Sequence, residues 1–265
     1  MNKSKAYWKK RADENLKIVD NLCDDHMKRL QTFYYETLKK VDDKIKDIYI
    51  LMLKNGGAIN TTNLYAAGRW IQLKSFLESE LQIAGQYQVT QAQKTLEAVY
   101  KQVMEKSYID LDSSLRWGFV NESQMKTAID SVWSGKHFST RIWGNTEQLA
   151  FNIEKHIKDL VTMGKMPNDI KKQLMNDFNT GFFEADRLVR TESIYQMNQS
   201  ASMSYQNAGI TEYEFLAEID DRTSNECREH NRKRYLFTQA VVGENMPPLH
   251  PMCRSCITPI TSLNA

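Results

Sequence analysis

A period of three and four residues dominates the first hundred positions of the chain. Apolar side chains recur at this spacing from Ala12 to Met52, which is one face of an amphipathic helix, before "NGG" at residues 55–57 interrupts the pattern. The same period runs from Trp70 to Val103, with Gly85 as a candidate break. About forty helical residues would reach roughly 60 Å, more than a compact domain of this size needs. We therefore expect two long helices that pair in antiparallel order.

The predicted elements become shorter after about residue 120. Gly135 and Gly144 are expected to bound a loop that is rich in aromatic and basic residues. The helical period resumes from Glu147 to Leu160 and again after Pro167, which suits the first turn of a helix. A further helix is expected from about residue 184 to residue 208. The middle of the chain is thus predicted to hold several separate helices.

Near the carboxyl end the period changes from that of a helix to that of a strand. In "YEFLAEI" at residues 213–219, apolar and polar side chains alternate, and "RYLF" and "CITPIT" predict two more short strands. The predicted fold class is α+β and mostly α-helical: long amino-terminal helices followed by a small C-terminal domain with a short antiparallel sheet. We place the two domains at residues 1–135 and 136–265.

Charge and hydropathy narrow the function only slightly. The 35 basic and 33 acidic side chains leave a formal charge of +2, so contacts with nucleic acid would depend on local patches. No apolar run approaches the roughly 18 to 20 residues that span a bilayer, and the amino end does not resemble a signal peptide. We expect a protein that is made and remains in a cytosol, without a membrane partner, in which cysteines stay reduced.

The segment "CREHNRKRYLFTQAVVGENMPPLHPMCRSC" at residues 227–256 gathers three of the four cysteines and two of the five histidines. Cys227 and His230 form one pair with two residues between them, and His250 and Cys253 form another. Two such turns brought together by a hairpin satisfy a tetrahedral zinc ion. The pattern predicts zinc as a cofactor on these four residues, with Cys256 as an alternative ligand.

Two other interpretations of this segment stay open. Cys227 and Cys253 would also fit as small apolar residues packed under a hairpin, with the histidines hydrogen-bonded to backbone or exposed. Cys253 and Cys256 have the spacing of a redox pair, but β-branched residues and a proline follow them, where such motifs need a strand followed by a helix.

The amino end is locally basic. "MNKSKAYWKKR" holds five basic residues and no acidic one, interleaved with Tyr7 and Trp8. A mobile arm of this composition would neutralise phosphates and stack on bases without sequence preference, and a solvated helix start explains the same residues equally well. The candidate DNA-binding residues are Lys3, Lys5, Lys9, Lys10 and Arg11.

Three motifs near the carboxyl end carry a resemblance to a known family. "RLVRTE" at residues 187–192, "DDRTSNEC" at 220–227 and "PPLHPMCRS" at 247–255, in this order, are similar to the Mu F-like minor head (minor capsid) proteins of tailed bacteriophages. The resemblance covers roughly residues 140–262. Many relatives carry Thr-Cys-x2-Cys where this chain has Thr223, Ser224 and Cys227, so a metal site of the family would have lost a ligand here.

The resemblance implies a structural virion protein and no enzyme. Mu F-like proteins are present in few copies inside the phage head, and some bind DNA during packaging or ejection. The implied partners are the portal protein, a scaffolding or major capsid protein, and double-stranded DNA bound without specificity. The alternative function is a zinc-stabilised module that binds nucleic acid and has no connection with capsids.

Within the resembling motifs, four charged residues are candidates for a structural role. Arg190 and Glu192 are predicted on a helix beside the sheet, where Asp221 and Arg222 would complete a charged network that orients the turn after the first strand. Ordinary solvated charges are the alternative, since exposed ion pairs contribute only 0 to about 1 kcal/mol.

A catalytic interpretation finds little support. "EYE" at residues 212–214 and "FST" at 138–140 resemble elements of ADP-ribosyltransferases, but the sequence between them is helical where that fold needs strands. The chain has no glycine-rich phosphate loop, no H-E-x-x-H motif and no nucleophile elbow.

Overall fold

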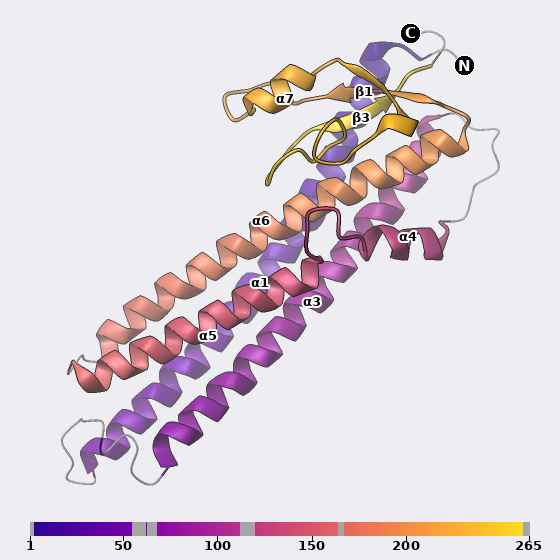
Figure 1. The fold of residues 1–265 in the computed structure, drawn as a ribbon. Coiled ribbons are helices and arrows are strands. Elements are labelled where there is room, and N and C mark those ends of the chain that lie inside the picture. The colour runs from indigo at the N-terminus through magenta and orange to yellow at the C-terminus, as the bar shows by residue number, and fades with distance from the viewer. Residues whose placement is uncertain (1–2, 55–61, 63–67, 112–119, 164–166, 262–265) are drawn as a thin grey trace. The chain divides into compact units, whose positions relative to one another are not determined.

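A computed structural model describes residues 3–54, 62, 68–111, 120–163 and 167–261. Four long helices account for most of these residues: α1 (Lys5–Lys54), α3 (Arg69–Asp110), α5 (Phe138–Thr162) and α6 (Pro167–Asn207). The shorter helices are α4 (Glu122–Ile129) and α7 (Asn225–His230), with one 3₁₀ turn at Phe237–Gln239. Three strands lie near the carboxyl end (Figure 1), so the predicted class, α+β and mostly helical, is confirmed.

The chain divides into two compact units that are not contiguous in sequence. The first unit comprises Met1–His26, Gln91–Phe138 and Asp186–Ala265, and the second comprises Met27–Thr90 and Ser139–Ala185. Helices α1, α3 and α6 therefore each contribute residues to both units. The division at residues 135 and 136 that the sequence suggested follows different boundaries and stays a prediction.

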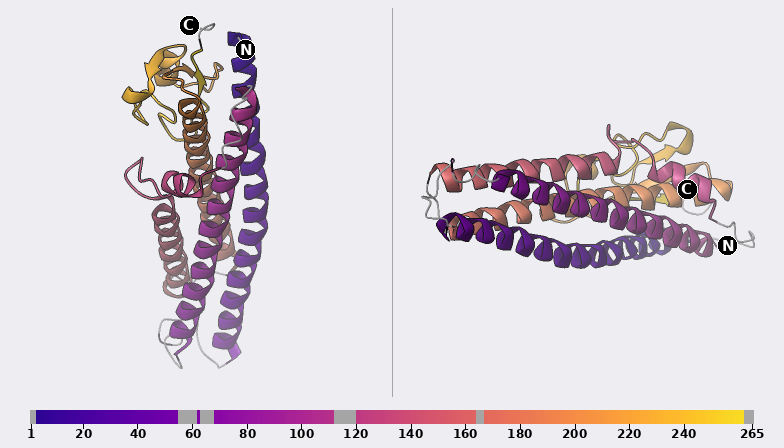
Figure 2. Two further views of the ribbon diagram at one scale, coloured as in Figure 1. Left: turned by 90° about the vertical axis from the view of Figure 1, so that its right-hand side faces the viewer. Right: turned by 90° about the horizontal axis from the view of Figure 1, so that it is seen from below.

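The second unit is a bundle built from segments of four helices, α1, α3, α5 and α6, which run side by side (Figures 1 and 2). Phe33 of α1 stacks on Tyr87 of α3 with ring centres 4.2 Å apart, and Lys40 of α1 pairs with Glu80 at 3.0 Å. Residues later in α1 thus contact residues earlier in α3. The predicted antiparallel pairing of the first two helices is confirmed in this unit.

In the first unit the same two helices hold each other through polar and aromatic contacts. The Tyr7 hydroxyl donates to the carbonyl oxygen of Asp110 at 2.9 Å, and His26 lies 3.2 Å from the Thr95 hydroxyl. Trp8 is 2% exposed and packs edge-on against a tyrosine of α6. The start of α1 is consequently part of the core of this unit.

The sheet of the first unit has the strand order β2-β1-β3, with both neighbours antiparallel to β1. The strands are β1 (Glu212–Leu216), β2 (Arg234–Leu236) and β3 (Cys256–Pro259), which confirms the three predicted strands. A small core gathers beneath them, formed by Phe215, Ala217, Cys227 and Cys253 with partly buried Tyr235 and Leu249. The cysteines of the candidate metal site therefore belong to the core under the sheet.

Three boundary predictions are wrong, two of them because a glycine does not break the helix that contains it. Gly85 lies inside the continuous helix α3, Gly144 lies inside α5 and bounds no loop, and α6 runs unbroken from residue 167 to residue 207. A single glycine in a helix costs only about 1 kcal/mol, which packing in a bundle offsets. Position 85 also requires a glycine, because the ring of Trp143 occupies the space that a side chain would fill.

Candidate metal centre

The turn after β1 places the first candidate ligand. Asp220 accepts a hydrogen bond from the backbone N–H of Arg222 at 2.9 Å, and Thr223 closes the turn by donating its hydroxyl to the carbonyl oxygen of Glu218 at 2.5 Å. Ser224 then caps helix α7 by accepting from the backbone N–H of Cys227 at 3.1 Å. The cap fixes Cys227 in the first turn of α7, with its side chain buried.

The second pair of candidate ligands comes from the loop before β3. The backbone N–H of Cys253 donates to the carbonyl oxygen of His250 at 3.2 Å, which closes a tight turn. Met252, at a φ of 60°, donates its N–H to the hydroxyl of Thr191 on α6 at 3.0 Å. A left-handed residue and an anchor on a long helix thus hold the turn in place.

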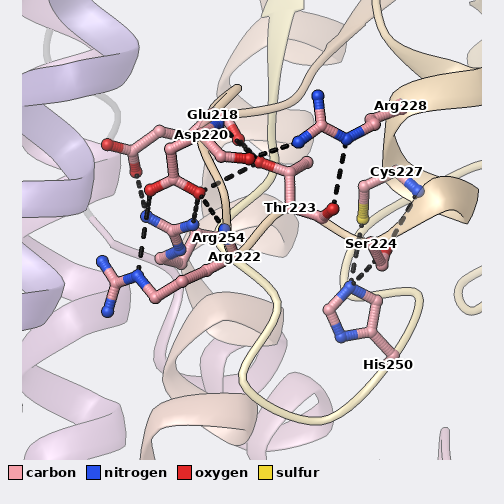
Figure 3. A network of polar contacts seen from close by, with 9 residues as sticks. All are labelled: Glu218, Asp220, Arg222, Thr223, Ser224, Cys227, Arg228, His250 and Arg254. Carbon is pink, nitrogen blue, oxygen red and sulfur yellow. Dashed lines mark hydrogen bonds and ion pairs between the residues drawn. The ribbon is translucent and has the colours of Figure 1, made fainter.

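Cys227, His250 and Cys253 form a compact cluster whose potential ligand atoms all lie within 4.8 Å of one another. Sγ of Cys227 lies 3.2 Å from Nε2 of His250 and 3.7 Å from Sγ of Cys253. Both sulfur-bearing residues are at most 2% exposed, whereas His250 is partly exposed. Figure 3 shows Cys227 and His250 pointing toward each other from α7 and from the loop before β3.

The two thiols of the cluster have pKa values shifted in opposite directions. A hydrogen bond from Cys253, reinforced by Ser224, lowers the pKa of Cys227. The same interaction, together with burial, raises the pKa of Cys253. The pair therefore favours one thiolate, on Cys227, with the proton kept on Cys253. A thiolate is the form in which cysteine binds a metal.

The cluster suits zinc in donor type and in orientation. Thiolate sulfur and imidazole nitrogen are the ligands of structural zinc sites. Nδ1 of His250 lies 2.8 Å from the carbonyl oxygen of Pro251. Because that oxygen can only accept, Nδ1 carries a proton, and Nε2 is the ring nitrogen that faces the sulfur atoms and would bind an ion in its deprotonated form. The backbone thus sets the tautomer that a zinc ligand needs.

The other two predicted ligands lie elsewhere. Nδ1 of His230 is 2.7 Å from the hydroxyl of Tyr235, and its ring lies beside Phe215. Cys256 is buried on β3, with its Sγ 3.7 Å from the carbonyl oxygen of Leu216. Neither belongs to the cluster. Of the five residues that the sequence offered, the structure brings three together.

A charged network braces the turn next to the cluster (Figure 3). Arg254 holds the carboxylate of Asp220 with two hydrogen bonds, of 2.7 and 2.5 Å, and approaches Glu218 at 3.4 Å. Arg228 of α7 donates to the carbonyl oxygens of Thr223 and Asp220. The Arg254 pairing lowers the pKa of Asp220. The network ties the turn after β1 to the residue that follows Cys253.

The predicted set of structural charges is arranged differently. Arg190 pairs with Asp24 at 2.5 Å and with Asp186 at 2.7 Å, within the helices. Glu192 accepts from the indole N–H of a tryptophan after α4, Trp133, at 2.8 Å. Asp221 is exposed, and the Arg222 guanidinium lies 3.8 Å from the Asp220 carboxylate. The acid that orients the turn is Asp220. Its side chain accepts a hydrogen bond from the backbone N–H two residues later in the chain, which is the pattern of an Asx turn.

The basic residues at the amino end lie mostly within helix α1. Lys3 donates to the carbonyl oxygen of Asp110, and Arg11 forms ion pairs with Glu14 at 2.8 Å and with Asp110 at 3.2 Å. These contacts raise the pKa of Arg11, chiefly through its hydrogen bond to Glu14. Lys5, Lys9 and Lys10 are exposed. Residues 5–11 are thus a helix start, with Trp8 buried, and not a mobile arm.

No helix among the described residues is both long and apolar enough to cross a membrane.

Comparison with known proteins identifies one relationship. No curated protein and no solved structure matches the chain. A family model described as Phage Mu protein F like protein matches residues 151–258. This stretch includes α6, strands β1 and β2, most of β3 and the three residues of the cluster. The resemblance drawn from the three sequence motifs is confirmed, and residues 151–258 of the chain are similar to the Phage Mu protein F like family.

Proposed function

We propose that the protein is a structural component of a tailed-phage head, a minor head protein that acts by binding other head proteins and not by catalysis. The observation that carries this proposal is the match of residues 151–258 to the Mu F-like family. The protein lies inside the head and associates with the portal during procapsid assembly, with a scaffolding or major capsid protein as its neighbour.

Exposed apolar side chains in the second unit support a protein partner. Ile50, Leu51 and Leu53 at the end of α1 are 46–52% exposed, and Ile71 at the start of α3 is 67% exposed. The end of α1 and the start of α3 lie at the same end of the bundle (Figures 1 and 2). Grouped apolar side chains on a surface are typical of sites that a partner covers.

Co-purification tests this proposal directly. The chain is expressed with the portal protein of the same phage, and separately with its scaffolding and major capsid proteins. We expect a stable complex with the portal that a Leu51→Lys, Leu53→Lys double variant weakens. The matched control is Val132→Lys in the first unit, whose parent side chain is 55% exposed and which we expect to leave the complex intact. Absence of a complex with all three head proteins would refute the proposal.

We also propose that Cys227, His250 and Cys253 bind one zinc ion whose role is structural. Elemental mass spectrometry on protein purified without a His-tag measures the metal content. We expect about one zinc per chain, lost in Cys227→Ser together with part of the stability of the carboxyl-terminal region. Cys23, which is buried in the helices, supplies the control Cys23→Ser, which removes a thiol without removing zinc.

A second candidate function is DNA binding without sequence preference. The observation that favours it is the set of exposed lysines Lys5, Lys9 and Lys10 on the first turns of α1. Three phosphate contacts would give a salt slope no steeper than about −3 in log K against log salt concentration. Binding to a double-stranded oligonucleotide at several salt concentrations, compared with a variant in which these lysines are glutamines, measures that slope. Binding that the variant retains in full would rule out this surface.

A further inference from the structure

The cluster has a fourth side chain at its edge. Oγ of Ser224 lies 2.9 Å from Nε2 of His250, the nitrogen that faces the two sulfur atoms. The same oxygen accepts from the backbone N–H of Cys227, so its position is fixed by the cap of helix α7. Figure 3 shows Ser224 and Cys227 on the same side of the His250 ring. Three metal-binding side chains and one serine hydroxyl therefore face a common point.

A serine hydroxyl is a poor fourth ligand for zinc. The protein ligands of zinc are cysteine thiolate, histidine nitrogen and carboxylate oxygen, and a neutral hydroxyl carries no charge to offset that of the ion. Among the described residues that line this region, Glu218 offers a carboxylate, but it lies 3.4 Å from Arg254 and outside the cluster. His230 and Cys256 are engaged by Tyr235 and by backbone. The cluster thus supplies three protein ligands.

The space beside Ser224 shows what can take the fourth position. A small cavity of about 10 Å³ is lined by Ser224, Cys227, His250, Met252 and Ser255, among others. A volume of this size holds about one water molecule and no larger ligand. Zinc sites with three protein ligands keep an open position that water fills. A hydroxyl at that position is suited to hold such a water by a hydrogen bond.

We infer that the proposed zinc ion is bound by Cys227, His250 and Cys253 and by one water molecule held by Ser224. The inference rests on the proposed zinc binding and adds that the site is incomplete in protein ligands. Such an ion is more easily lost than one held by four protein side chains. The space beside the cluster is small and partly open to solvent, which suits a water molecule at the fourth position and a structural role for the ion. A single substitution, Ser224→Cys, would supply the fourth protein ligand.

Cobalt(II) substitution and chelator competition test the inference on the full-length protein. The absorption of cobalt-thiolate charge transfer scales with the number of thiolates, so we expect it to rise by about half from wild type, with two thiolates, to Ser224→Cys, with three. The zinc dissociation constant should fall by roughly tenfold or more in that variant. Asn225→Cys is the matched control, because it adds a thiol at the neighbouring exposed position and should change neither quantity.

Ser224→Ala completes the set of variants. We expect it to keep one zinc per chain, because the hydroxyl holds the water and does not bind the ion. Wild-type protein that binds zinc, with Ser224→Cys unchanged in absorption and affinity, would overturn the fourth-position inference while the zinc site stands. Zinc loss in Ser224→Ala as complete as in Cys227→Ser would make the serine a ligand, and would also overturn it. Wild-type protein that binds neither zinc nor cobalt would overturn the zinc site itself.

Discussion

Replacement of Asn198 by alanine tests how α6 holds the edge of the sheet. β3 is an edge strand, so one side of its backbone lacks a strand partner. The side chain of Asn198, which is 1% exposed, fills that role: its carbonyl oxygen accepts from the N–H of Ile257 at 3.0 Å, and its amide donates to the carbonyl oxygen of Ser255 at 3.3 Å. The same amide also donates to Ile194 within α6 at 2.9 Å.

The cost of the substitution follows from these contacts. Alanine leaves the buried N–H of Ile257 and the carbonyl oxygen of Ser255 without their partner, and each orphaned group costs about 1 to 3 kcal/mol. The hydrogen bond to the Ser255 carbonyl oxygen is the longer and weaker of the two, so the cost of losing it lies at the lower end of this range. The higher helix propensity of alanine returns about 0.5 kcal/mol. We expect Asn198→Ala to lower the free energy of unfolding of the first unit by about 3 kcal/mol.

Urea denaturation followed by circular dichroism, together with hydrogen exchange of the peptide that covers residues 253–260, measures this effect. We expect an earlier transition for the first unit and faster exchange in β3. Asn179→Ala is the matched control, because Asn179 is exposed on the same helix and its substitution should be neutral or slightly stabilising. A change below about 0.5 kcal/mol with unaltered exchange at β3 would refute the assigned role of Asn198.

Two further substitutions test the helices. Gly85→Ala should lower the stability by about 1 to 2 kcal/mol in thermal unfolding, because the added Cβ would meet Trp143 ring carbons at 2.8 and 2.9 Å. Gly144→Ala, with open space around it, should raise the stability by about 0.5 to 1 kcal/mol. Equal effects at the two glycines would contradict the assigned contact between Gly85 and Trp143. Glu14 has its pKa lowered from 4.5 to about 2, chiefly by Lys106. A lowered folded-state pKa gives stability that is present above pH 4.5 and lost as the pH falls toward 2. We therefore expect Glu14→Gln to remove about 1 kcal/mol at neutral pH and nothing near pH 2, as measured by urea unfolding at both values.

The sequence predicts the long helices well because one face of each repeats without interruption. The apolar positions from Ala12 to Met52 lie mostly on the buried side of α1. The first strand forms where it was predicted, but the alternation does not carry over into burial, because Glu214 and Leu216 are buried together with Phe215. Helix boundaries are less predictable, because a local breaker competes with contacts from distant residues. Gly85 looks like a break until the Trp143 ring is placed against it, and that contact joins positions far apart in the chain.

The candidate site shows the same limit. Spacing identified Cys227, His250 and Cys253, since each comes from a turn with two intervening residues. Spacing also favoured His230, but the hydroxyl of Tyr235 at 2.7 Å engages its ring, and the pairing of β2 with β1 sets the place of that tyrosine. The serine at the edge of the cluster was visible only as a departure from the family motif.

The hairpin that carries the cluster is fixed by contacts that need no metal. The Arg254 pair with Asp220 holds the turn after β1, the hydroxyl of Thr191 holds the loop before β3, and Asn198 holds β3. A cross-link between residues 26 apart, as Cys227 and Cys253 are, restricts the unfolded chain by about 3.5 kcal/mol on the chain-entropy account. That gain adds to a fold already defined by hydrogen bonds and packing. Three protein ligands would therefore suffice for the proposed zinc ion, because the ion would reinforce a geometry that the surrounding residues already impose.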